Sequence, residues 1–291
     1  YHGWFDNILW STAPALNAAG PSDEPVRVAG SLGQSADDGR GVDVLQWNDL
    51  AALERRLARG DVAGVIMEPA MCNQGAIAPL PGYLEGALAA CRRHGTILVF
   101  DEVITGFRLG AGGAQQRFAV TPDLSIFAKA IANGFPAAAI AGRADLMDMF
   151  VDGVLHGGTF NSHPVVMAAL VATQQELTPA HYDATSARGL RLRDGVAGAL
   201  AAAGIKAQVT GFESMFHVAF GLDAPARNYR DLAQANKRGY ALFALALLRR
   251  GVRVLERGAW FVSAAHDDAI VDQTLAIVTE AALEVAAQLE G

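Results

Sequence analysis

The stretch LVFDEVITGFRLG, Leu98 to Gly110, places two adjacent carboxylates, Asp101 and Glu102, directly after a run of apolar residues. A continuous apolar run of this kind is typical of a strand that is covered on both faces, as in a parallel sheet. In open parallel sheets, ligands bind beyond the carboxyl ends of the strands. The stretch therefore predicts a buried strand whose end carries acidic side chains to a binding site.

Helix and strand patterns alternate on both sides of this stretch. Residues 48–60 have an N-cap residue, an apolar face and a closing glycine, and the apolar run 62–67 follows them. A second helix of the same design, 81–95, precedes the strand at 96–100, and further strands are expected at 124–127 and 137–143. Alternation at this pace predicts an α/β fold with βαβ units and a mostly parallel sheet.

Three charged residues follow three of the expected strands: Glu68, Asp101 and Lys129. Parallel strands end at the same edge, so two acids and one lysine should meet there. A lysine amine forms a Schiff base with an aldehyde cofactor, and a carboxylate beside a pyridine nitrogen keeps that nitrogen protonated. The set predicts pyridoxal 5'-phosphate chemistry, although any one of these residues, considered alone, is also explained by a strand that ends in solvent.

Three longer segments carry a resemblance to a known family: residues 65–108, which contain DEVITGFR, residues 122–143, which contain FAKAIANGFP, and residues 156–164, HGGTFNSHP. They resemble the class III aminotransferases of fold type I, and in particular the branch that is similar to glutamate-1-semialdehyde 2,1-aminomutase. The DEVxTGFR pattern followed by a lysine at this spacing is specific. The resemblance extends from YHGW at Tyr1 to the C-terminal helix and implies a pyridoxal-phosphate-dependent enzyme.

The resemblance implies two catalytic residues. Lys129 would be the Schiff-base lysine, and Asp101 would be the partner of the pyridine nitrogen. Val103 would pack against one face of the cofactor ring, although its position also fits plain core. Tyr1 and His2 resemble the aromatic segment that covers the other face.

Further cofactor contacts follow from the same resemblance. Glu68 and Asn73 would lie near the cofactor's hydroxyl or the substrate's amino group. Gly158 and Thr159 resemble a phosphate-contacting turn that the second subunit donates. A homodimer with shared active sites is therefore implied.

Other residues have a structural and a functional interpretation. Glu102 is interpreted as a structural ion-pair acid, which Arg108 would hold. The resemblance places Glu256, Trp260 and His266 around the substrate entrance, whereas a packing tryptophan and a structural histidine are the plainer interpretations. No arginine stands out as the substrate carboxylate clamp; the candidates are Arg27, Arg108 and Arg257.

The chain is predicted to form two domains. Residues 1–176 would be the large cofactor-binding domain and 177–291 a smaller C-terminal α/β domain. In the family, a glycine- and serine-rich turn that binds the phosphate at a helix N-terminus precedes the YHG segment. This turn is absent, so the N-terminal part of the large domain is expected to be missing, either omitted here or lost from the protein itself.

The preferred function is an aminotransferase that moves an amino group between an amino acid or amine and a keto or aldehyde acceptor. The first alternative is intramolecular amino transfer of the aminomutase type, because residues 11–31 occupy the place of the aminomutase's gating loop without obviously repeating it. The second alternative is a truncated, non-catalytic dimerisation partner. A nicotinamide oxidoreductase is disfavoured because no GxGxxG follows any expected strand.

Composition limits the remaining possibilities. The chain has 23 Lys and Arg residues and 30 Asp and Glu residues, which gives a net charge of -7. This balance predicts neither a nucleic-acid partner nor binding to an anionic lipid surface. No apolar run approaches the roughly 20 residues that span a bilayer. Cys72 and Cys91 lack the number and spacing of a disulfide framework or metal site. A cytoplasmic location with small-molecule substrates and no metal is expected.

Overall fold

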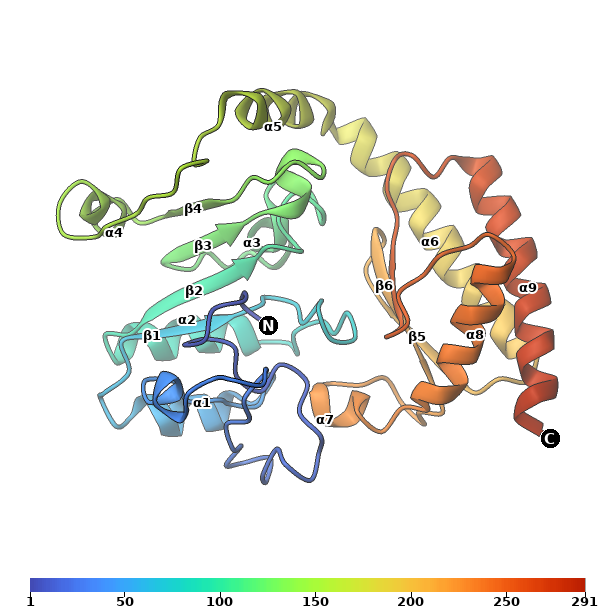
Figure 1. The fold of residues 1–291 in the computed structure, drawn as a ribbon, viewed down its shortest axis with the longest axis horizontal. Coiled ribbons are helices and arrows are strands. Elements are labelled where there is room, and N and C mark those ends of the chain that lie inside the picture. Colours follow the sequence, from blue (N-terminus) through green and yellow to red (C-terminus); the bar gives the residue numbers. More distant parts are fainter. Residues whose placement is uncertain (291) are drawn as a thin grey trace.

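The computed structural model describes residues 1–290, which form two lobes, each around its own β-sheet (Figure 1). The larger lobe contains η1 (Ala36–Gly39), α1 (Leu50–Leu57), β1 (Gly64–Met67), α2 (Tyr83–Arg93), β2 (Ile97–Glu102), α3 (Gly113–Phe118), β3 (Leu124–Phe127), η2 (Lys129–Ala132), β4 (Ala139–Gly142), α4 (Ala144–Met147), η3 (Asp148–Phe150) and α5 (Pro164–Glu176). The smaller lobe contains α6 (Pro179–Ala202), β5 (Ala207–Gly211), β6 (Met215–Phe220), α7 (Tyr229–Leu232), α8 (Lys237–Arg249), β7 (Ala259–Phe261) and α9 (Asp268–Glu290).

The sheet of the larger lobe has the strand order β1-β2-β3-β4. Strands β1, β2 and β3 are parallel, whereas β4 pairs antiparallel with β3, so that Leu124 lies opposite Gly142. The prediction of a mostly parallel sheet is confirmed. Strand β4 is reversed because only η2 and a short loop separate it from β3, and a parallel return needs a crossover of a dozen or more residues.

Strand β2 presents different residues to its two faces. Leu98 and Phe100 are fully buried and pack with Leu53 and Leu57 of α1 and Leu84 of α2. Successive side chains of a strand point to opposite faces, so Asp101 leaves the helix-covered face that Phe100 occupies. The packing of Leu98 and Phe100 fixes the orientation of β2, so the side chain of Asp101 is directed to the opposite face of the sheet.

The smaller lobe has an antiparallel sheet of order β5-β6-β7. All residues of β6 are buried, and Phe216, Val218 and Phe220 join the core that α6, α8 and α9 provide. The two strands predicted around Gly211 are confirmed, since β5 ends at this glycine with a φ of 123°. Figure 1 shows the three helices on the far side of this sheet from the larger lobe.

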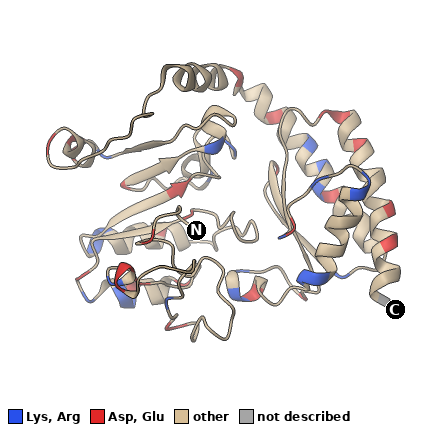
Figure 2. Cartoon of the chain, in the orientation of Figure 1, with Lys and Arg blue, Asp and Glu red and all other residues tan. Residues whose placement is uncertain are grey.

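Charged residues of both signs are interspersed over the helices of the smaller lobe (Figure 2). Several form ion pairs between helices, including Arg188 of α6 with Asp268 of α9 at 3.2 Å and Arg250 with Glu284 at 2.7 Å. Exposed pairs of this kind contribute little, about 0–1 kcal/mol each. Within residues 1–290, no helix combines the length and apolar character needed to cross a membrane.

The chain passes from one lobe to the other between α5, which ends at Glu176, and α6, which begins at Pro179. Helix α6 begins here because Thr178 caps it, accepting a hydrogen bond from the His181 amide at 3.3 Å, and Pro179 suits the first helical position. The division into domains 1–176 and 177–291 stays a prediction; the junction between α5 and α6 lies at the predicted boundary.

Candidate active site

The three predicted charged residues lie at one edge of the larger sheet. Glu68 directly follows β1, Asp101 is near the end of β2, and Lys129 comes two residues after β3. Their charges interact, because the carboxylates of Asp101 and Glu68 both affect the pKa of the Lys129 amine. The structure therefore brings these three residues together, as their positions after parallel strands predicted.

Asp101 is buried, with 6% of its surface exposed, and both carboxylate oxygens have partners. His2 Nδ1 lies 2.7 Å from Oδ2, and the Val103 amide donates to Oδ1 at 3.0 Å. Sequence reasoning expected His2 to cover a ring face and did not predict this contact, which joins residues 99 positions apart. His2 therefore contributes to holding the carboxylate in place.

Lys129 begins the turn η2 with a φ of 49°, a left-handed conformation that non-glycine residues rarely adopt. The side chain is exposed, yet the protein surrounding the amine displaces part of its water and lowers its pKa. Asp101 and Glu68 oppose this shift, and Arg108 and Arg257 add to it. Among the residues described, the Lys129 amine has no recorded hydrogen bond or ion pair, so it is available to a ligand.

Glu68 is buried and its carboxylate holds the loop after β1. Its Oε2 atom accepts hydrogen bonds from the amides of Cys72 and Asn73, each at 3.0 Å. Burial raises the pKa of this carboxyl, which the Asn73 amide partly opposes. Glu68 also lines a cavity of about 250 Å³ together with Tyr1 and His2, so these three predicted residues share one space.

Glu102, one residue beyond Asp101, is fully buried and serves a different purpose. Its carboxylate accepts hydrogen bonds from Thr105 Oγ1 at 2.9 Å, the Ala114 amide at 2.7 Å and Gln115 Nε2 at 2.9 Å. The expected ion pair with Arg108 is wrong, because neutral donors at the start of α3 satisfy this acid. Over the described part of the chain, no ion pair of the Arg108 side chain is recorded; its Cζ lies 5.0 Å from the centre of the Phe261 ring.

The remaining predicted cofactor contacts are more dispersed. Val103 is half-buried beside Asp101, and Tyr1 is half-exposed, with 51% of its surface accessible. Gly158 and Thr159 lie in the segment before α5, in which every residue from 151 to 165 is exposed. No recorded interaction within residues 1–290 joins this segment to Asp101 or Lys129, so a single chain does not assemble the whole predicted set.

The predicted substrate-entrance residues of the smaller lobe do not form a common site. Trp260 is buried, stacks on Phe216 with ring centres 5.4 Å apart, and donates its indole N–H to the Tyr240 hydroxyl at 3.0 Å. His266 Nδ1 accepts from the Ser263 amide at 3.0 Å and so closes a turn. The enclosure of Trp260 in the folded core fits the packing interpretation, and Glu256 is exposed; the entrance roles of these residues stay predictions.

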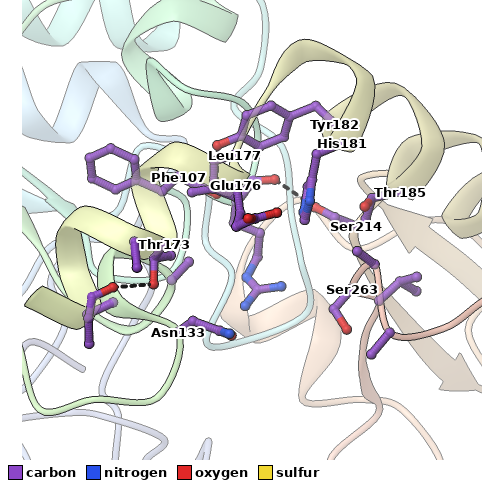
Figure 3. A pocket seen from close by; sticks show the side chains of 18 of the residues that line it. Phe107, Asn133, Thr173, Glu176, Leu177, His181, Tyr182, Thr185, Ser214 and Ser263 are labelled. Atoms are coloured by element: carbon purple, nitrogen blue, oxygen red, sulfur yellow. Dashed lines mark hydrogen bonds between the residues drawn. The ribbon is translucent and has the colours of Figure 1, made fainter.

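A larger cavity of about 460 Å³ lies between the two lobes. Figure 3 shows residues of the larger lobe on one side of it, Phe107, Asn133 and Thr173, and residues of the smaller lobe on the other, Thr185, Ser214 and Ser263. Ala130, Ala132 and Asn133, which follow Lys129 closely, form part of its wall. Arg108 also lines this cavity. The cavity is thus adjacent to the turn that presents the free amine.

Comparisons with known proteins place these observations in a family. Residues 35–281 match the family described as aminotransferase class-III. The chain is 37% identical over 279 residues to the glutamate-1-semialdehyde 2,1-aminomutase of Methanothrix thermoacetophila, covering 94% of this chain and 63% of that protein. It is 36% identical to the protein of the same name from Sorangium cellulosum, covering 97% of this chain and 64% of that protein.

Solved structures are similar as well. An omega-transaminase from Sphaerobacter thermophilus matches with a TM-score of 0.88 and 30% identity, over 99% of this chain and 67% of that one. A glutamate-1-semialdehyde aminomutase from Pseudomonas aeruginosa PAO1 matches with a TM-score of 0.84 and 26% identity, over 98% of this chain and 64% of that one. The predicted fold type I architecture is confirmed, and the chain spans slightly less than two thirds of the curated relatives just described.

Proposed function

This chain belongs to the class III aminotransferase family, and from that premise we propose that it transfers amino groups with pyridoxal 5'-phosphate as its cofactor. The observation that carries the proposal is the meeting of a buried carboxylate, Asp101, with an unpartnered lysine amine, Lys129, at one sheet edge. The amino donor would be an amino acid or amine, and the acceptor a keto or aldehyde compound.

The chemistry of these side chains fits the cofactor. Lys129 would hold the aldehyde carbon, and Asp101 would face the ring nitrogen, with His2 orienting the carboxylate through the 2.7 Å contact. When bound, the cofactor supplies an electron sink for the carbon that carries the amino group. Val103 and Tyr1 would flank the ring, and Glu68 and Asn73 would lie near its hydroxyl or the substrate's amino group.

Lys129 is also suited to moving a proton. An ordinary lysine amine is protonated at neutral pH and cannot accept a proton, whereas a lowered pKa increases the neutral fraction. Burial lowers the pKa of the Lys129 amine, and the positive charges of Arg108 and Arg257 act in the same direction. Lys129 would therefore take and return the proton at the carbon bonded to the amino group.

Intramolecular transfer of the aminomutase type is the second candidate, because both curated relatives described above carry that name. The segment 11–31, which corresponds to the gating loop, is anchored to α7 of the smaller lobe. Tyr229 donates its hydroxyl proton to the Pro14 carbonyl at 2.5 Å, and Arg230 donates to the carbonyls of Ala19 and Pro21, each at 3.1 Å. We prefer the aminotransferase because the residues of this segment do not obviously repeat the aminomutase loop.

A homodimer is part of the proposal. The exposed segment that carries Gly158 and Thr159 also exposes large apolar side chains, with accessible fractions of 89% for Val151, 100% for Leu155 and 81% for Phe160. Exposed apolar groups gathered in one segment are typical of an interaction surface. We propose that this segment reaches a second subunit, where Gly158 and Thr159 would contact the cofactor phosphate.

A non-catalytic dimerisation partner stays the third candidate. It predicts that the chain alone forms no stable cofactor complex. We also propose the cytoplasm as the compartment, which is consistent with Cys72 and Cys91 being free and buried.

The test is an absorption spectrum of the purified chain with pyridoxal 5'-phosphate, followed by borohydride reduction and peptide mapping. A visible band that bleaches with an amino donor, with the reduced adduct on Lys129, would support amino transfer. Isomerisation of glutamate-1-semialdehyde without an added acceptor would favour the aminomutase. The absence of a band would contradict catalysis by this chain and favour the non-catalytic partner.

A further inference from the structure

His217 of β6 is a buried histidine whose ring has one defined partner. The residue is 4% exposed, and burial lowers its pKa to about 4, so the imidazole is neutral near pH 7. A neutral imidazole carries a single N–H group. Its Nε2 atom lies 2.7 Å from the Arg257 carbonyl oxygen, which can only accept a hydrogen bond. The proton is therefore on Nε2, and His217 donates it to the Arg257 carbonyl.

The turn that carries Arg257 lies directly against this ring. The Gly258 amide donates to the Leu255 carbonyl at 3.0 Å, and the Val218 amide donates to the Gly258 carbonyl at 2.9 Å. A Cβ atom at Gly258 would lie 2.5 Å from His217 Nε2, and the residue has a φ of 105°. Glycine is required at this close approach, so the imidazole and the turn fix each other's position.

His217 is on the face of β6 that is directed to the larger lobe. Phe216 and Val218 belong to the core that the helices of the smaller lobe cover. Successive side chains of a strand point to opposite faces, so His217 shares the other face with Met215. Met215 belongs to the same buried cluster as Cys72 of the larger lobe. The turn held by His217 therefore lies near the contact between the lobes.

The Arg257 side chain crosses from this turn to the larger lobe. Its Nη2 atom donates to Asn73 Oδ1 at 3.4 Å, and within residues 1–290 no ion pair of Arg257 is recorded. A guanidinium can only donate, so Asn73 turns its amide oxygen to Arg257 and its NH₂ group away from it. In the described part of the chain, no acceptor of this NH₂ group is recorded, which leaves its N–H groups available to a ligand.

We propose that His217 is a positioning residue: by holding the Arg257 carbonyl, it places the guanidinium against Asn73, which then directs its N–H groups to an oxygen atom of the bound cofactor. The ring hydroxyl of pyridoxal 5'-phosphate is such an oxygen, whereas a protonated amino group of a substrate cannot accept a hydrogen bond. The inference rests on the proposed function and assigns a part in it to two residues of the smaller lobe.

The position of the Arg257 charge can be measured through Lys129. Burial is the main cause of the lowered pKa of the Lys129 amine; Asp101 and Glu68 oppose it, and Arg108 and Arg257 add to it. Displacement of the Arg257 side chain would therefore change the protonation of Lys129, and this change can be detected without any cofactor.

The first measurement is the tautomer of His217 in the wild-type chain, by heteronuclear NMR of protein labelled at histidine. We expect the proton on Nε2, as the contact with the Arg257 carbonyl requires. A proton on Nδ1 would overturn the proposal, because the carbonyl oxygen would then face a nitrogen without a hydrogen. The result does not depend on whether any variant folds.

The second measurement is the pH profile of Lys129 acetylation in the chain without cofactor, by trace labelling and peptide mapping. Arg257→Gln removes a nearby positive charge, so the profile should move to higher pH and labelling near neutral pH should fall roughly twofold or more. His217→Leu, which removes the donor, should move the profile in the same direction. His217→Gln keeps a donor and should resemble the wild type. Arg253→Gln, at another exposed arginine near the turn, is the matched control and should leave the profile unchanged.

A purely structural histidine gives a different result. His217→Leu would then lower the melting temperature without moving the Lys129 profile, which would overturn the proposal. An unmoved profile in Arg257→Gln, or equal displacement in His217→Leu and His217→Gln, would also overturn it. If His217→Leu does not fold, Gly258→Ala takes its place, because the added Cβ pushes the turn off the ring, and the same displacement is expected.

Cofactor binding tests the proposed function separately. The wild type should bind pyridoxal 5'-phosphate roughly tenfold more tightly than the 3-deoxy analogue, which lacks the ring hydroxyl, as expected for one hydrogen bond. Asn73→Ala and His217→Leu should lose most of this preference. A displaced Lys129 profile without any cofactor binding would support the positioning of Arg257 and contradict amino transfer. Cofactor binding with an equal preference in the wild type and His217→Leu would support the cofactor assignment and reject positioning by His217.

Discussion

The two ends of the larger sheet each hold an aspartate with 6% of its surface exposed, yet the two carboxylates are bound in different ways. At the amino end of β3, Asp123 accepts from the Leu98 amide at 2.8 Å and pairs with Arg143 at 3.0 Å. At the carboxyl end of β2, Asp101 contacts His2, a titratable side chain, and lies near the unpartnered Lys129.

This difference is the basis for our proposal that Asp123 is a structural acid and Asp101 a functional one. Asp123 ties β3 to β2 and to β4, since Arg143 directly follows β4, and all of its partners are permanent parts of the fold. At the other end, Lys129 and Arg108 keep charges that the described chain does not neutralise. Equal burial therefore does not separate the two aspartates, whereas the charged side chains near them do.

The largest effect is expected for Lys129→Ala. Loss of the amine removes both the covalent attachment point and the proton acceptor, so amino transfer should fall by about 10²- to 10⁴-fold. Borohydride labelling of the residue should disappear while the melting temperature is retained. Lys206→Ala, which removes an exposed lysine paired with Asp223, is the control and should keep the label. Undiminished transfer in Lys129→Ala would reject the assignment.

Asp101→Ala should have the next largest effect. Without the carboxylate, a bound ring nitrogen loses its negative partner, and transfer should fall by roughly 10²- to 10³-fold, as for removal of one electrostatic stabilising group. The cofactor can still bind, so the absorption spectrum and steady-state kinetics are measured together. Full activity in this variant would show that Asp101 resembles Asp123 in being structural.

His217 provides a titration that belongs to the smaller lobe alone. Burial lowers its pKa from 6.5 to about 4, and its ring contacts the Arg257 carbonyl at 2.7 Å. As the pH falls, the imidazole of this histidine takes up a proton in the unfolded chain before it does so in the folded chain. The contribution of neutral His217 to the free energy of unfolding is therefore complete above about pH 6.5 and is lost as the pH falls toward 4. The loss should reach roughly 3 kcal/mol in the free energy of unfolding. Denaturant curves of His217→Gln should lack this component; an identical pH dependence would disprove it.

Asp123→Ala should affect stability and leave the chemistry intact. The substitution leaves the buried Leu98 amide without an acceptor, which costs about 1–3 kcal/mol. Urea denaturation should show this loss, while labelling of Lys129 stays at the wild-type level. A loss of labelling in a folded Asp123→Ala sample would mean that the two ends of the sheet are not independent.

Much of the site could be predicted because it depends on local pattern. The apolar runs before Glu68 and Asp101 identify strands, and parallel pairing then brings their ends together without further information. Pairings between distant residues could not be predicted in this way. Nothing in YHGW indicates that His2 reaches Asp101. The interpretation of Glu102 as an ion-pair acid held by Arg108 did not anticipate the donors that Thr105 and α3 supply.

The family was predicted from the resemblance of three longer segments. Periodic pattern alone was sufficient for the mostly parallel sheet and for the position of Asp101 and Lys129 at one edge. These features follow from periodic burial and from backbone direction, which neighbouring residues control. By contrast, only the folded structure shows which charged side chains have a partner. The enclosure of Trp260 by Phe216 and Tyr240 depends on how the smaller lobe folds, and the donors to Glu102 depend on how the larger lobe folds. The contact of the Arg108 guanidinium with the Phe261 ring joins the two lobes, so it exists only once both are assembled.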